Sequence, residues 1–67
     1  MHFGLYLAEL MAEHGFCPKE LQRRIGVSDA VVPYWLAGKH KPRKSNMIKI
    51  ANVFEADPLK VMAKAKA

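Results

Sequence analysis

Apolar residues recur along the chain at intervals of three and four positions, which is the spacing of residues on one face of a helix. The first such stripe predicts a helix over about residues 2–13, which would bury Phe3, Leu7, Leu10 and Met11. His14 and Gly15 are expected to end this helix, after which Phe16 returns the chain to the core.

Residues 17–38 predict two further short helices joined by a tight turn, with apolar positions at Leu21, Ile25, Val27, Val32 and Trp35. The first is expected over residues 18–25 and the second over about residues 29–37. Between them, Gly26 allows a left-handed backbone at little steric cost, and the hydroxyl of Ser28 is expected to cap the second helix. A helix-turn-helix of this kind typically presents its second helix to the major groove of DNA, while the first lies across the backbone.

The C-terminal third of the chain predicts two more helices. Pro42 blocks helix continuation, and a fourth helix is expected to begin between Arg43 and Asn46, with a core stripe of Met47, Ile50, Ala51 and Phe54. Asp57 followed by Pro58 is typical of a helix start, so a fifth helix is expected there, before a fraying tail at residues 63–67. Its apolar Val61 and Met62 either complete the core or form a dimer surface.

Length and composition bound the architecture. Sixty-seven residues are enough for one small domain, so we expect a single domain over residues 1–67. Apolar residues make up 51% of the chain, which favours a compact all-α domain over disorder. No apolar run approaches the roughly 20 residues of a membrane span, and the first residues lack the basic region of a signal peptide. We therefore expect no membrane association and a cytoplasmic location.

The charge balance favours a polyanionic partner. Eleven Lys and Arg residues against six Asp and Glu residues give a formal net charge of +5. Five of these basic residues follow the second helix of the motif: Lys39, Lys41, Arg43, Lys44 and Lys49. Such a run is often only a solvated loop, but the motif that precedes it favours contact with phosphates.

Other chemistry finds little support in the sequence. Cys17 is the only cysteine, and its place before Pro18 at a helix start favours a structural role. The three histidines lie in different segments without the spacing of metal ligands. No nucleophile–base pair, paired carboxylates or phosphate-binding glycine loop is found, so we expect no catalytic residues, no metal, no cofactor and no small-molecule substrate.

The order of these landmarks resembles the Cro/repressor, or XRE-type, helix-turn-helix family. None of these landmarks is specific to the family by itself, but their order within one short chain is specific. The resemblance extends over nearly the whole chain. The resemblance implies a compact five-helix, lambda repressor-like DNA-binding domain with its helix-turn-helix at about residues 18–37. The landmarks are Phe3-Gly4, Leu7, Leu21, Gly26-Val27-Ser28, Trp35, Gly38-Lys39-His40-Lys41-Pro42, Ile50-Ala51 and Phe54.

Two residues depart from that family's pattern. Gln22 stands where the family usually has alanine, at the closest approach of the two motif helices, so its side chain must extend outward or widen the crossing. Pro33 stands at the fifth position of the expected second helix, where it would remove one hydrogen bond and press on the carbonyl of Asp29.

The resemblance also implies which residues contact DNA. The first, second, fifth and sixth residues of the second motif helix approach base edges in that family, which gives Asp29, Ala30, Pro33 and Tyr34 here. Ala30 suits a thymine methyl, Asp29 can accept from a cytosine amino group, and Tyr34 can donate to a base or a phosphate. Because this set holds few donors, groove shape and the basic loop are expected to contribute to sequence preference. The candidates for phosphate contact are Lys19, Arg23, Ser28, Lys39, His40, Lys41, Arg43 and Lys44.

These observations lead us to expect a regulator that binds double-stranded DNA and acts as a repressor, in which a homodimer covers a promoter at a palindromic operator. Small free-standing members of the family serve as phage repressors, antitoxins, restriction-modification controllers or autorepressors of anti-CRISPR operons, and the sequence leaves this choice open. The alternative is a protein-interaction module on the same fold that has lost DNA reading, which the donor-poor face and Pro33 suggest.

Overall fold

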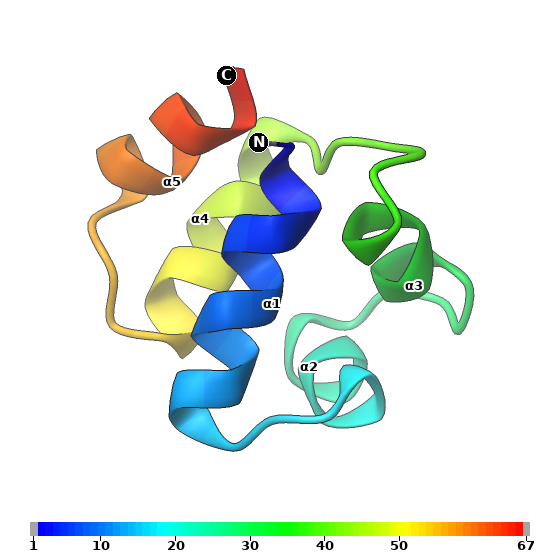
Figure 1. The fold of residues 1–67 in the computed structure, drawn as a ribbon. Coiled ribbons are helices and arrows are strands. Elements are labelled where there is room, and N and C mark those ends of the chain that lie inside the picture. Colours follow the sequence, from blue (N-terminus) through cyan, green and yellow to red (C-terminus); the bar gives the residue numbers. More distant parts are fainter. Residues whose placement is uncertain (1, 67) are drawn as a thin grey trace.

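The protein folds into five helices, as described by a computed structural model that covers residues 2–66 (Figure 1). No strand occurs within those residues, so the predicted all-α fold is confirmed. The helices are α1 (Phe3–His14), α2 (Pro18–Ile25), α3 (Val31–Leu36), α4 (Lys44–Val53) and α5 (Pro58–Lys66). Within the described part of the chain, no helix is long and apolar enough to span a membrane.

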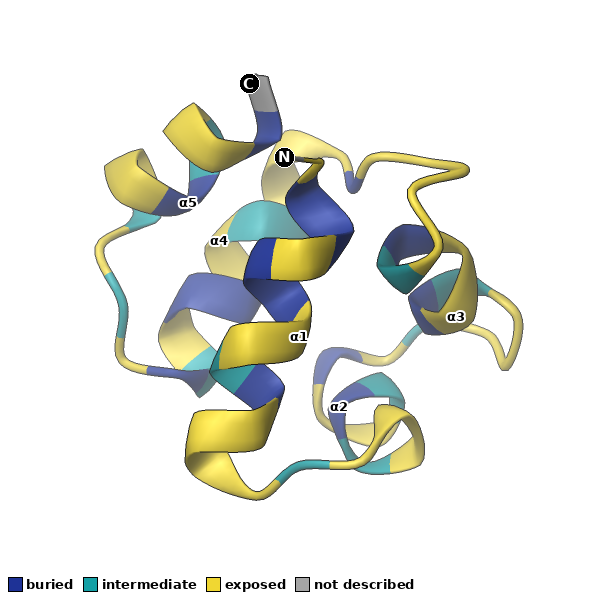
Figure 2. Ribbon diagram, in the orientation of Figure 1, coloured by how far each residue is buried: buried dark blue, intermediate teal, exposed yellow. Residues whose placement is uncertain are grey.

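All five helices contribute side chains to one core, in which α1 packs against α3 and α5 while α2 packs against α3 and α4 (Figure 2). Most of the predicted apolar stripes are buried as expected, although Leu10 and Met47 are only half-buried at the edge of the core. Phe16 does return to the core, where its ring packs against the ring of Phe54 with 5.3 Å between the two ring centroids. The largest side chains that are completely enclosed are Leu7, Leu21, Val32, Ile50 and Val61.

Gly4 is a buried position that the stripe on α1 did not predict. A β-carbon at this residue would lie 2.4 Å from the backbone carbonyl oxygens of both Trp35 and Leu36. This distance is well below van der Waals contact, so only a residue without a side chain lets α1 approach the end of α3 this closely. The position of α3 on the rest of the molecule therefore depends on Gly4.

Tyr6 is also buried, next to Phe3 on α1 and outside the predicted stripe. The ammonium group of Lys64 lies over its ring, 5.7 Å from the ring centroid, and so connects α1 to α5. Burial raises the pKa of the Tyr6 hydroxyl above its usual value, and the carboxylates of Glu13 and Glu9 raise it further.

Glycines end the first two helices, as the sequence predicts. Gly15 and Gly26 both have left-handed backbones, with φ of 70° and 73°. The amide of Gly26 donates to the carbonyl of Gln22 at 2.9 Å, which closes the last turn of α2. The bounds predicted for α2 are confirmed, whereas α1 begins and ends one residue later than expected.

The start predicted for the third helix was wrong. Asp29 and Ala30 form a turn, and α3 begins at Val31, whose amide donates to the carbonyl of Ser28 at 3.2 Å. The Ser28 hydroxyl makes no capping bond, because Ala30 occupies the N-cap position and Ser28 lies two residues before it. The helix also ends at Leu36, one residue before the expected end.

This shorter α3 changes the interpretation of Pro33. The residue is the third of the helix rather than the fifth, so it lies in the first turn. Amides in a first turn have no acceptor inside the helix, which means that Pro33 removes no hydrogen bond of the helix interior. The proline therefore fits α3 with much less strain than the sequence indicated.

The C-terminal helices begin as predicted, α4 at Lys44 and α5 at Pro58, with the Asp57 carboxylate accepting a hydrogen bond from the amide of Leu59 at 3.0 Å. The expected fraying of the tail was wrong within the described residues. The helix continues to Lys66, because alanine favours helix and the side chain of Ala65 is buried against the core.

Candidate nucleic-acid interface

The helix-turn-helix consists of α2, the turn at residues 26–30 and α3. Val32 and Trp35 fix α3 to the core, with exposed fractions of 0% and 3%. Because these two residues lie on one side of a short helix, the opposite side faces solvent. In Figure 2 the outer side of α3 is accordingly coloured as exposed.

All four residues predicted to read bases are exposed. Ala30, Pro33 and Tyr34 follow one another at helical spacing on the outer face, and Asp29 lies in the turn just before α3. This surface is mostly apolar, since alanine and proline side chains have no hydrogen-bonding group and Tyr34 offers one hydroxyl. Its chemistry suits methyl groups and sugar edges more than polar base edges.

Tyr34 contacts two basic residues of the following loop. The ring of His40 packs edge-on against the Tyr34 ring with 5.3 Å between centroids, and the Lys39 ammonium lies 5.7 Å from the same ring. The amide of Lys39 also donates to the Tyr34 carbonyl at 3.0 Å, which holds the loop against the end of α3. The structure thus joins a candidate base reader and two candidate phosphate contacts in one cluster.

Gln22 reaches outward from the crossing of the two motif helices, which was one of the two alternatives that the sequence left open for this residue. Its Nε2 donates to the Asp29 carboxylate at 2.6 Å, so the side chain connects α2 to the turn before α3. This contact between Gln22 and the candidate base reader Asp29 was not predicted from the sequence. It orients the Asp29 carboxylate and occupies one of its oxygen atoms.

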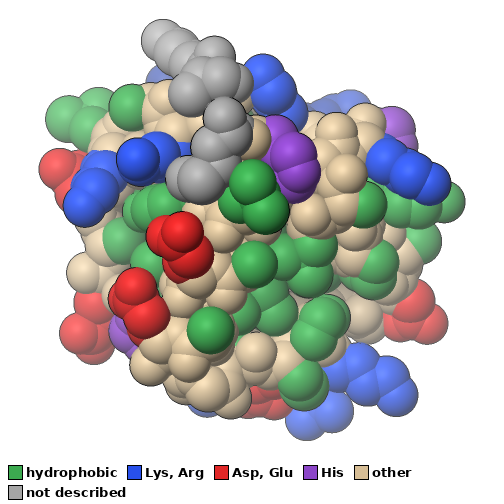
Figure 3. Space-filling model, viewed as in Figure 1, with side chains coloured by type: hydrophobic (Ala, Val, Ile, Leu, Met, Phe, Trp, Pro, Cys, Tyr) green, Lys and Arg blue, Asp and Glu red, His purple; other side chains and the backbone are tan. Residues whose placement is uncertain are grey.

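The loop between α3 and α4 presents a row of exposed basic side chains around a buried Pro42. Among the side chains of residues 2–65, the only ion pairs involve Glu20, so no carboxylate of those residues neutralises the basic side chains of the loop. In Figure 3, basic side chains and a histidine gather at the upper right, over this loop. The exposed members of the loop and of the adjoining start of α4 are Lys39, His40, Lys41, Arg43 and Lys44.

The N-terminus of α4 adds to this basic surface. The helix begins at Lys44, directly after Arg43, and Arg43 makes no side-chain capping bond. The positive end of the helix dipole and its first amides therefore lie beside the basic side chains. The sequence predicted phosphate contacts for the basic loop, but the helix start beside it was not singled out, although Pro42 followed by a new helix was the signal for it.

The basic residues of α2 divide into two groups. Lys19 and Arg23 are exposed. The guanidinium of Arg23 comes no closer than 3.8 Å to the Glu20 carboxylate, so this weak ion pair leaves it free to contact a phosphate. Arg24 is instead fixed by a 3.1 Å contact with Glu20 and by the ring of Phe16, whose centroid lies 4.9 Å from the guanidinium carbon. Ser28, the remaining phosphate candidate, is exposed in the turn.

The arrangement as a whole suits recognition of a duplex. An exposed helix lies between a basic loop on one side and the exposed cations of α2 on the other, which is how phosphate contacts position a reading helix in a groove. Among residues 2–66, no group of three or more His, Cys, Asp or Glu side chains is placed to hold a metal ion.

Comparison with known proteins agrees with this geometry. The family model described as helix-turn-helix matches residues 7–61, which include all of α2, α3 and α4. No curated protein and no solved structure matches the chain significantly. Because the family match covers most of the chain and the structure shows its defining motif, the protein belongs to the XRE-type helix-turn-helix family of DNA-binding regulators.

Proposed function

We propose that the protein is a transcriptional repressor that acts as a homodimer on a palindromic operator in the cytoplasm, with residues 1–67 as one DNA-binding domain. The observation that carries this proposal is the exposed outer face of α3 beside a basic loop whose charges have no carboxylate partner among the described residues. Bound at a promoter, such a dimer would exclude the transcription machinery by occupying its site. No catalytic step is required.

The residues divide into two roles in this proposal. Ala30, Pro33 and Tyr34 read base edges from the outer face of α3 and its N-cap, and Asp29 does so from the turn before it. Basic side chains from α2 and from the loop hold phosphates on either side: Lys19, Arg23, Lys39, His40, Lys41, Arg43 and Lys44. The contact of Lys39 and His40 with Tyr34 means that reading and phosphate binding are mechanically coupled.

A second candidate is a protein-interaction module that no longer reads DNA. The apolar character of the α3 surface favours this alternative, since Ala30 and Pro33 offer no hydrogen bond to a base. The two candidates differ in their dependence on salt, because apolar protein contacts respond much less to ionic strength than phosphate contacts do.

Titration of duplex DNA across a salt series tests the proposal. If about three basic side chains per subunit contact phosphates, a dimer neutralises about six phosphates, and log K should fall with log salt at a slope of roughly −5. Lys41→Ala removes one phosphate contact per subunit and should flatten the slope by about 2 without changing the preferred sequence.

Lys64→Ala is the matched control, since it removes an exposed lysine of α5 that belongs neither to the helix-turn-helix nor to the basic loop, and should leave the slope unchanged. Fluorescence anisotropy with a labelled duplex measures all three proteins. A slope near zero for the unmodified protein would reject the repressor and favour the interaction module.

A further inference from the structure

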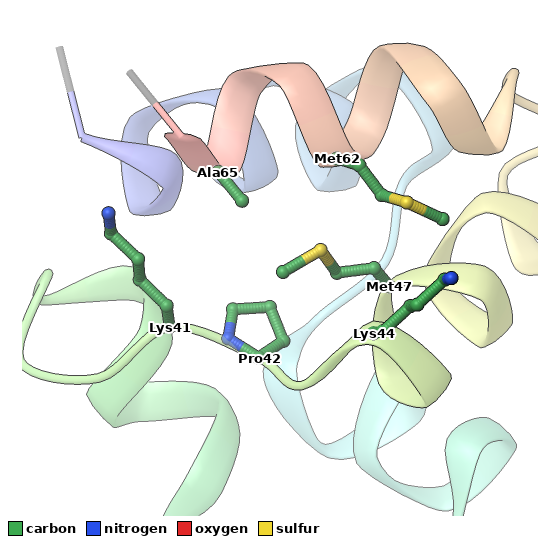
Figure 4. Close-up of a pocket in the computed structure, with 6 residues that line it drawn as sticks. All are labelled: Lys41, Pro42, Lys44, Met47, Met62 and Ala65. Carbon is green, nitrogen blue, oxygen red and sulfur yellow. The ribbon is translucent and has the colours of Figure 1, made fainter.

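A groove lies between the basic loop and α5, and its apolar side chains have no part in the base and phosphate contacts proposed above. Its volume is about 510 Å³, and it is lined by Lys41, Pro42, Lys44, Met47, Met62 and Ala65. Figure 4 shows Pro42 and Met47 on one side of the groove, with Met62 and Ala65 facing them from α5. A volume of this size is in the range of small-molecule sites.

The surface between the ends of the groove is apolar and adaptable. Met47 and Met62 are half-buried thioether side chains on different helices, and such unbranched chains adjust to ligands of varied shape. Pro42 and Ala65 are buried and add rigid apolar surface. A flexible hydrocarbon chain suits this part of the groove.

The ends of the groove are positive. Lys41 and Lys44 are both exposed and lie at opposite ends of the groove in Figure 4, and the described residues that line it include no carboxylate. Lys44 is also the first residue of α4, so the positive end of that helix adds to the field at its end of the groove. The charge complement of this site is therefore an anion attached to an apolar body.

We propose that this groove binds an amphiphilic carboxylate of the fatty-acid type, with its acyl chain between Met47 and Met62 and its carboxylate at Lys44. The sequence predicts no small-molecule substrate, and the ligand proposed for this groove is bound reversibly and not transformed. Lys41 and Lys44 also belong to the surface proposed to contact phosphates, so the ligand and DNA should compete. That competition rests on the proposed DNA-binding function, whereas ligand binding does not.

Methionine methyl groups report on the groove directly. In protein labelled with ¹³C-methyl methionine, titration with decanoate should shift the signals of Met47 and Met62 saturably. The signal of Met11, which is buried in the core at 5% exposure, should not move. Decyltrimethylammonium has the same chain with the opposite charge and should shift neither signal. Equal shifts with both compounds, or no shift with decanoate, would overturn the proposal.

Variants locate the charge and the chain. Lys44→Gln should weaken decanoate binding about five-fold, as expected for the loss of one exposed ion pair. Lys60→Gln, the matched lysine outside the groove, should leave the affinity unchanged. Met62→Gln keeps the length of the side chain and should abolish saturable binding. If Lys44→Gln and Lys60→Gln bind decanoate equally well, the carboxylate is not held at Lys44 and the proposal is wrong.

Two further measurements test whether a second copy of the protein covers the groove and whether decanoate competes with DNA. Shifts of the Met47 signal that depend on protein concentration without decanoate would show that a second copy covers the groove, and would overturn the ligand site. Anisotropy with labelled duplex in the presence of decanoate then tests competition. Unchanged DNA affinity at saturating decanoate would reject the competition, and the ligand site would then be judged by the methionine methyl signals alone. Absence of DNA binding altogether would reject only the proposed function.

Discussion

At the residue scale, Gly4 shows how much one position can decide. We expect Gly4→Ala to lower the free energy of unfolding by about 2 kcal/mol or more, because the new methyl group would overlap two backbone carbonyls of α3 that cannot rotate away. Thermal denaturation followed by circular dichroism measures the change, and 1 kcal/mol corresponds to about 4–8 °C in a domain of this size.

Gly15→Ala provides the control for that substitution. Its β-carbon would meet nothing within 4 Å, so the only penalty is the left-handed backbone at φ of 70°, about 1 kcal/mol. If the two variants lose the same stability, the close approach of α1 to α3 does not constrain residue 4 and the interpretation of this contact is wrong.

Pro33 is the second residue whose environment can be tested. Its place in the first turn of α3 means that Pro33→Ser should change the free energy of unfolding by no more than about 0.5 kcal/mol, since no interior hydrogen bond is restored. Chemical denaturation with urea measures this difference. A gain of about 1 kcal/mol would instead indicate that the helix extends further toward Asp29 in solution.

At the scale of elements, the crossing of α2 and α3 depends on a contact between side chains. The Gln22 amide donates to the Asp29 carboxylate with 2.6 Å between the nitrogen and the oxygen, and this hydrogen bond joins α2 to the turn before α3 on the exposed side of the motif. We expect Gln22→Ala and Asp29→Ala each to lower the free energy of unfolding by up to about 1 kcal/mol, and the double variant to lose no more than either single one.

A double-mutant cycle by urea denaturation gives this coupling. Additive losses in the double variant would show that the two side chains act independently. Arg23→Ala serves as a control for the loss of an exposed polar side chain on α2, because its contact with Glu20 is long at 3.8 Å and its side chain is 78% exposed.

At the scale of the whole molecule, a single helix-turn-helix reads only a few base pairs, so specificity calls for two copies on half-sites about 34 Å apart. We expect the contact between subunits to include residues 55–62, because Leu59 is 73% exposed there and α5 lies across the molecule from α3 (Figure 1). Light scattering on a palindromic duplex should then report two proteins per duplex.

Leu59→Asp should reduce this stoichiometry or weaken binding to the full palindrome, while affinity for a half-site stays the same. Leu5→Asp, at another exposed leucine with 48% exposure on α1, is the matched control. One protein per palindromic duplex at saturation would contradict the dimer.

The sequence by itself determined the features that depend on near neighbours. The number and order of the helices, the bounds of α2 and the starts of α4 and α5 follow from periodicity, proline and helix caps, which act within about one turn. The left-handed Gly26 follows from the same local chemistry. The exposure of Asp29, Ala30, Pro33 and Tyr34 likewise follows once Val32 and Trp35 are assigned to the core.

The tertiary structure alone decided what depends on residues distant in sequence. The demand for glycine at residue 4 comes from carbonyls more than 30 residues away, and the burial of Ala65 comes from packing of α5 on the core. The start of α3 and the Gln22–Asp29 contact follow from how α2 approaches the turn. The groove exists only because the fold brings the loop and the start of α4 next to α5, whose lining residues lie at least 15 positions further along the chain. Periodicity identifies the buried face of a helix, but the angle and distance at which two such faces meet are set by packing across the whole core.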